Sequence, residues 1–166
     1  LSSIALTEST LRELPFEVEY YFRTIRNILP IYPETPVKVV PNGEIPLPRD
    51  TEFSIEFLGE NMITVRCESD SYPFEKTTAF GEEITVNGGS FSIECRNVDW
   101  VNKNLDRTLY FNIHSRKHLV DYFVRRINVE LVSRDGSVLQ VSMLGTNPEK
   151  DVDFLNKHLE GFQAIS

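Results

Sequence analysis

The strongest constraint on the fold is a pair of β-hairpin patterns in the middle of the chain. In residues 53–67, "FSIEFLGENMITVRC", apolar and polar residues alternate on both sides of the turn Gly59-Glu60-Asn61. Residues 84–95, "ITVNGGSFSIEC", repeat this pattern around Asn87-Gly88, a dipeptide that tolerates the positive φ angles of a tight turn. Period-two alternation is typical of half-buried strands, so we expect antiparallel pairing within each segment.

Other segments also have the character of strands. Residues 16–22, "FEVEYYF", alternate apolar and polar positions, and residues 37–40 and 108–113 are short β-like runs. A third hairpin is predicted from "INVELV" and "VLQVSML" around the turn Ser133–Gly136, with Leu139, Val141 and Met143 facing inward. Prolines at 41, 46 and 48 predict an extended connector or an edge strand over 41–50.

Three segments have helical periodicity. The predicted helices cover 6–15, with Thr7 or Ser9 as N-cap, 116–127, with Ser115 as N-cap, and a last helix that Asn147 caps and Pro148 begins. Their predicted buried stripes are, in order, Ile4, Leu11 and Leu14; Leu119, Tyr122, Phe123 and Ile127; and Val152, Leu155, Leu159 and Phe162. Gly161 weakens the last helix without a convincing end, so we expect this helix to be the root of a longer arm.

Together these patterns predict an α+β fold, with mostly antiparallel β-hairpins, two or three packing helices and a β-rich middle over 41–100. With 166 residues, of which 40% are hydrophobic, the chain is long enough to bury the core of a single domain, 1–166.

Charge argues against a nucleic-acid partner. The formal net charge is −8, whereas binding to phosphates needs clustered Lys and Arg. No apolar stretch approaches the ~18 residues that span a bilayer. The chain starts at Leu1 and not at Met, so we expect any membrane segment or export signal to lie outside this piece.

Two cysteines, Cys67 and Cys95, fit no zinc-ligand spacing. Each ends an alternating strand pattern on its inward face. If these strands are neighbours and the compartment is oxidising, a disulfide can form; the alternative is two buried thiols.

Catalytic motifs are missing from the sequence. It contains no GxxxxGK[ST] loop and no G-x-S-x-G elbow, and the i, i+4 pair His114 and His118 lacks a third metal ligand, so we expect no catalytic residue, cofactor or metal. Acidic pairs such as Glu82-Glu83 are better explained as strand-edge charges than as a glycosidase pair. Trp100, Tyr72 and Tyr110 could stack on sugar rings, with core packing as the alternative.

The final third of the chain resembles a known family. The resemblance rests on these segments: the aromatic strand with Tyr110 and Phe111, the helix with Leu119 and Tyr122, the strand Ile127–Leu131, "SVLQVS", and Pro-Glu-Lys followed by "DFLN". Over 105–163 this order resembles the periplasmic region of Wzz-like polysaccharide co-polymerases, the chain-length determinants. It is most similar to the Bacteroidetes-type capsule and exopolysaccharide proteins that are joined to a tyrosine autokinase. "ELPFEVEYYF" and "YPETPVKV" also resemble that group, whereas 41–100 shows little likeness.

The resemblance implies a non-catalytic domain at the periplasmic face of the bacterial inner membrane. It would oligomerise with its own copies, work with the polymerisation and export machinery, and influence polymer length, with membrane anchors outside this fragment. The chain departs from the family by lacking membrane segments, a long coiled-coil arm and the kinase. The alternative hypothesis is a carbohydrate-binding β-module that recognises a surface glycan, and a third is a glycan-cleaving enzyme.

Overall fold

The computed structural model describes residues 3–42, 47–131, 139–143 and 148–165. The chain forms two compact units: a terminal unit, Leu1–Glu17 with Ser115–Ser166, and a β-sandwich unit, Val18–His114. The predicted α+β class with antiparallel β-hairpins is confirmed, and strands also lie outside 41–100. That residues 1–166 form a single domain stays a prediction. No described helix is both long and apolar enough to cross a bilayer.

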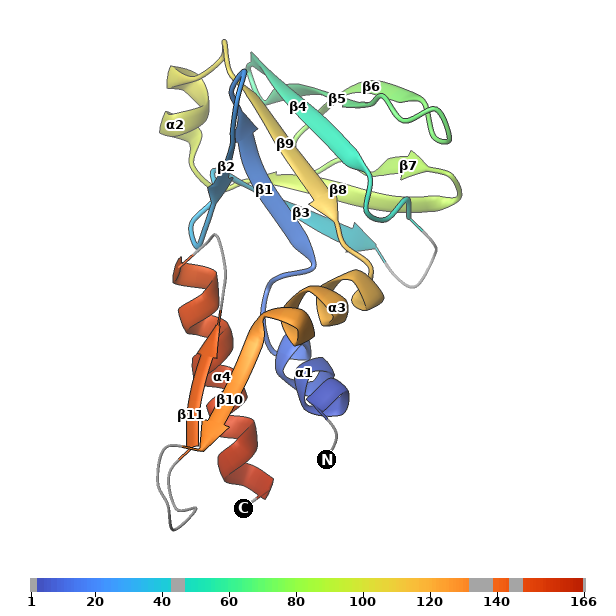
Figure 1. Ribbon diagram of the computed structural model, residues 1–166. Helices are drawn as coiled ribbons and strands as arrows, with labels where there is room; N and C mark the ends of the chain where they lie inside the picture. Colours follow the sequence, from blue (N-terminus) through green and yellow to red (C-terminus); the bar gives the residue numbers. More distant parts are fainter. Residues whose placement is uncertain (1–2, 43–46, 132–138, 144–147, 166) are drawn as a thin grey trace. The chain divides into compact units, whose positions relative to one another are not determined.

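Two antiparallel sheets form the β-sandwich unit (Figure 1). The first has six strands in the order β2-β1-β9-β4-β5-β6, and the second has the order β3-β8-β7. The strands are β1 (Val18–Arg23), β2 (Ile28–Ile31), β3 (Val37–Asn42), β4 (Glu52–Gly59), β5 (Met62–Cys67), β6 (Phe74–Ala79), β7 (Ile84–Val86), β8 (Gly89–Cys95) and β9 (Thr108–Ile113). A short helix, α2 (Val98–Lys103), connects β8 to β9.

The core lies between the two sheets. Phe53 on β4 stacks on Phe111 of β9, with ring centroids 5.1 Å apart, and meets Phe91 of the second sheet edge-on at 5.7 Å. Inward residues of both sheets, among them Val37, Ile55 and Ile93, complete one buried cluster. The alternation in the sequence therefore produces a two-layer sandwich whose inner faces share one apolar interior.

Both predicted central hairpins are confirmed. Phe53 pairs with Cys67 and Ile55 with Val65, and the intervening turn has positive φ at Gly59, Glu60 and Asn61. In the second hairpin, Asn87 and Gly88 have φ of 50° and 83°. The segment 41–50 was predicted as connector or edge, and β3 does end at Asn42 on the edge of its sheet. The strands β2 and β6 and the helix α2 were not predicted from the sequence.

Three helices and a hairpin form the terminal unit: α1 (Ser3–Arg12), α3 (Arg116–Arg126), α4 (Pro148–Ile165), β10 (Ile127–Leu131) and β11 (Leu139–Met143). The rings of Phe123 and Phe154 stack at 4.3 Å, and Phe16 stacks on Phe123 at 5.4 Å. The predicted third hairpin is confirmed by the pairing of β10 with β11. Its turn at 133–136, the side chains of Leu139, Val141, Met143 and Phe162, and the cap Asn147 lie outside the described residues.

The helix caps and stripes were predicted only in part. Ser115 caps α3, because its Oγ accepts a hydrogen bond from the His118 amide at 3.1 Å. Thr7 and Ser9 are wrong as caps, since α1 already begins at Ser3. On α3 the buried residues are Val120 and Phe123.

The stripe predicted for α4 is also wrong. Val152 is 54% exposed and Leu159 40%, whereas Phe154 and His158 are buried. On α1, Ile4 is exposed and Leu6, Thr7, Thr10 and Leu11 are buried. Packing of Phe154 against Phe123 fixes which face of α4 turns inward, and hydropathy alone does not reveal that choice.

Gly161 follows the same inward face of α4. A Cβ atom at this position would lie 2.7 Å from Cδ1 of Leu6 on α1. The absence of a side chain at Gly161 therefore permits a close approach of α4 to Leu6. The packing gained in this way offsets the low helix propensity of glycine.

We expect His158 to make the terminal unit less stable in mild acid. The imidazole stacks on Phe154 and lies 3.1 Å from Thr10 Oγ1, whose single proton is donated to the Leu6 carbonyl, so His158 Nδ1 is the donor. Burial lowers the pKa of His158 below the unfolded-state value of about 6.5. Between these two values the unfolded chain binds more protons than the folded chain, so stability falls as the pH is lowered through this window and levels off below the folded-state pKa.

Urea unfolding followed by circular dichroism between pH 7 and pH 5 tests this expectation. The variant His158→Gln should show a flatter dependence of unfolding free energy on pH than the wild type. Identical slopes for the two proteins would contradict a buried neutral imidazole.

Candidate functional site

A groove in the β-sandwich unit, lined by residues that the structure describes, is a candidate binding site. Its volume is about 530 Å³, within the range of small-molecule sites. Three segments that are distant in sequence contribute to it: the β1–β2 hairpin, the connection from β2 to β3, and the start of α2. This aromatic groove is lined by Phe22, Ile31, Pro33, Glu34, Thr35, Pro36, Arg96, Asn97 and Trp100.

Backbone hydrogen bonds hold these segments together. The carbonyl of Pro36 accepts bonds from the amides of Arg96 and Asn97, at 2.8 and 3.1 Å. Asn97 then caps α2 through its Oδ1, which accepts from the Trp100 amide at 2.9 Å. The connection after β2 and the first turn of α2 are thereby fixed against each other, which gives the groove a defined shape.

Aromatic rings form the apolar part of the groove. Trp100 is half-buried, stacks on Phe22 with centroids 5.8 Å apart, and meets Phe57 edge-on at 5.8 Å. The guanidinium of Arg107 lies 3.9 Å from the centroid of Phe22. Such contacts restrict the rings, so a ligand would meet a preorganised apolar surface.

Polar side chains line the same groove. Glu34, Arg96 and Asn97 are exposed, and Thr35 is half-buried with its hydroxyl donated to the Val37 carbonyl at 2.6 Å. The groove thus combines a carboxylate acceptor, a guanidinium donor and an amide with an aromatic surface.

The structure separates the three aromatic residues that the sequence suggested as glycan contacts. Trp100 lines the groove, whereas Tyr72 lies in the connection between β5 and β6, and Tyr110 stacks on Tyr21 at 5.9 Å on the other face of the six-stranded sheet. Phe22 and Ile31 come from β1 and β2, and the other groove residues come from a proline-rich connection and a helix start with no motif. For this reason the sequence did not mark them as a site.

That other face carries a polar network. Tyr21 donates a hydrogen bond to Glu52 at 2.6 Å, Asn112 donates to the Tyr21 hydroxyl at 2.9 Å, and Arg23 pairs with Glu52 at 2.8 Å. Burial and the Glu52 carboxylate raise the pKa of Tyr21, so its hydroxyl stays protonated and acts as a donor. These bonds satisfy the network internally, and their main consequence is to fix the positions of β1, β4 and β9.

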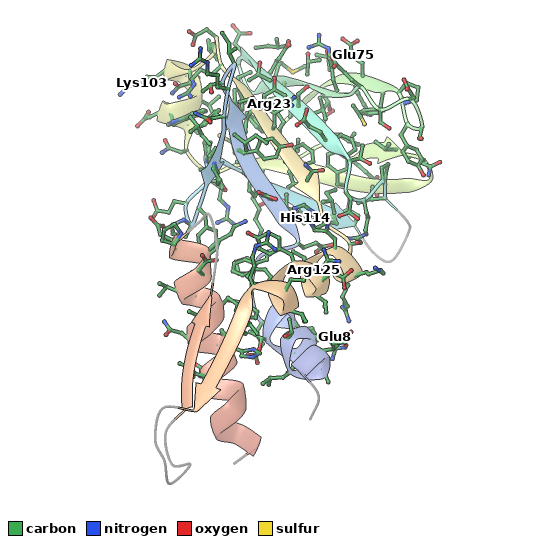
Figure 2. The ribbon with its side chains drawn as sticks, in the orientation of Figure 1. Glu8, Arg23, Glu75, Lys103, His114 and Arg125 are labelled. Carbon is green, nitrogen blue, oxygen red and sulfur yellow. The ribbon has the colours of Figure 1, made fainter. Side chains whose placement is uncertain are left out.

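His114 ends the same face. Its Nε2 lies 2.6 Å from Glu19 Oε2, and its Nδ1 lies 3.2 Å from Asp50 Oδ1. Figure 2 labels His114 and Arg23 near opposite ends of the β1–β9 pair. His118, which forms an i, i+4 pair with His114 in the sequence, belongs to the terminal unit. The expectation that the chain binds no metal stays a prediction.

Cys67 and Cys95 are free thiols in the structure. Cys67 ends β5 of the six-stranded sheet and Cys95 ends β8 of the three-stranded sheet. The two strands belong to different sheets and do not pair with each other, and the disulfide stays a prediction.

Comparisons with known proteins identify no family. No family model matches the sequence, and no curated protein matches it. Among solved structures, the chain is similar to a crystal structure of FlgL from Xanthomonas campestris, with 12% identity and a TM-score of 0.23. This similarity covers 85% of the present chain but only 56% of the FlgL chain, and at that TM-score it carries no argument about fold or function.

Proposed function

We propose that this chain is a non-catalytic domain of a protein that assembles or exports capsular polysaccharide or exopolysaccharide. The aromatic groove would be its point of contact with the glycan. The groove is the observation that carries the proposal, and the resemblance to chain-length determinants over 105–163 supplies the biological setting.

The lining of the groove supports a carbohydrate ligand. Apolar C–H groups on a sugar ring pack on aromatic surfaces, while its hydroxyl groups need both donors and acceptors. Trp100 and Phe22 provide the first requirement, and Glu34, Arg96 and Asn97 provide the second. A volume of about 530 Å³ is suited to a short stretch of glycan.

Fluorescence of Trp100 tests this proposal, because it is the single tryptophan of the chain. Titration of the intact chain with oligosaccharides released from the capsule or exopolysaccharide of the source organism should produce a saturable change in emission. No change, together with no heat of binding by calorimetry, would refute glycan binding in the groove.

The resemblance extends the proposal to assembly. The parent protein would form a homo-oligomer at the periplasmic face of the inner membrane and influence polymer length. Light scattering on the parent protein in mild detergent should give the mass of an oligomer, and a monomer would count against this role.

A further inference from the structure

We propose that the aromatic groove selects an uncharged sugar ring, and that Glu34 is the residue that disfavours acidic sugars. This inference rests on the proposed function and adds the charge class of the ligand. The sequence gives no indication of that class, because Glu34 and Arg96 are 62 positions apart and join the same groove only in the fold.

Two opposite charges line the groove. Glu34 lies in the connection between β2 and β3, and Arg96 directly follows β8. Both side chains are exposed, and within the described residues no hydrogen bond or ion pair engages either of them. Both are therefore available to a ligand.

These two side chains offer the acceptor and the donor that the hydroxyl groups of a neutral sugar need. A hydroxyl can donate to the Glu34 carboxylate, and a neighbouring hydroxyl can accept from the Arg96 guanidinium. Because the two side chains carry opposite charges, a neutral ring leaves the charge of the groove balanced.

An acidic sugar fits less well. Its carboxylate could pair with Arg96, but it would then meet the like charge of Glu34 in the same groove. The chain as a whole has a formal charge of −8, which also repels a polyanionic glycan at long range. Arg107 is not one of the residues that line the groove; its guanidinium lies over the Phe22 ring.

A matched pair of ligands tests the proposal on the full chain. The first is an acidic oligosaccharide released from the exopolysaccharide, and the second is the same oligosaccharide after chemical reduction of its carboxyl groups to alcohols. Affinities are measured by calorimetry for the wild type and for Glu34→Gln. The control variant is Glu68→Gln, because Glu68 is an exposed carboxylate of the same unit outside the groove.

We expect the wild type to bind the reduced, neutral form at least about tenfold more tightly. Glu34→Gln should improve binding of the acidic form about threefold to tenfold, with a smaller gain in about 0.5 M salt, and Glu68→Gln should leave both affinities unchanged. Equal or tighter binding of the acidic form by the wild type would overturn the inference while glycan binding stands. Binding of neither form would refute the proposed function itself.

Discussion

Replacement of Phe53 by Ala is expected to lower the unfolding free energy of the β-sandwich unit by about 3–5 kcal/mol. Phe53 is fully buried on β4, and its ring stacks on Phe111 and meets Phe91 edge-on. The residue therefore joins the two sheets. Truncation removes the apolar burial of the ring and both aromatic contacts, and leaves a cavity where the sheets face each other.

Urea unfolding followed by Trp100 fluorescence measures this loss, since Trp100 lies in the same unit. Ser54→Ala is a matched control on the next residue, whose side chain faces the opposite side of the sheet, and it should change stability by less than about 0.5 kcal/mol. A loss below about 1 kcal/mol for Phe53→Ala would mean that the core has been misassigned.

Replacement of Trp100 by Ala is expected to weaken oligosaccharide binding at least about tenfold, equivalent to roughly 1.4 kcal/mol. The substitution removes the largest aromatic surface of the groove and its contact with Phe22. Calorimetry measures the affinity, and circular dichroism checks that the variant is folded.

Two further variants separate this effect from a loss of stability. Tyr72→Ala removes an aromatic residue that the sequence also suggested as a glycan contact but that lies outside the groove, so binding should be unchanged. Arg96→Ala removes an exposed groove residue with little structural role and should also weaken binding. Equal losses for Trp100→Ala and Tyr72→Ala would contradict the site.

The hairpins were predictable because each one is specified by residues within its own short segment. Asn87-Gly88 determines a tight turn by its own backbone preferences, and the alternation beside it determines which face is buried. The strand order of the six-stranded sheet could not be predicted from such local patterns. The strand β9 pairs with both β1 and β4, which precede it by many residues, and no local signal specifies that choice.

Helix faces were harder to predict for a different reason. Hydropathy favoured Val152 and Leu159 on α4, yet the aromatic stack of Phe154 and the close approach of Leu6 to Gly161 turn the other face inward. The short strand β2 was missed because it contains Pro30, which is tolerated only because β2 lies at the edge of its sheet.

The candidate site was predictable only at Trp100. A lone tryptophan suggests a stacking surface, but Glu34, Thr35 and Arg96 have no motif that marks them. These residues lie beside Trp100 because the Pro36 carbonyl accepts hydrogen bonds from the amides of Arg96 and Asn97, which holds the β2–β3 connection against the start of α2. The sequence does not reveal this tertiary contact.

Amide chemical-shift mapping of the oligosaccharide on the isotope-labelled chain locates the binding site residue by residue. We expect the shifts to concentrate at Phe22, Glu34, Thr35, Arg96 and the Trp100 indole, all in the aromatic groove. Shifts that concentrate around Tyr110, or in the terminal unit, or that are missing at saturating ligand, would contradict this expectation.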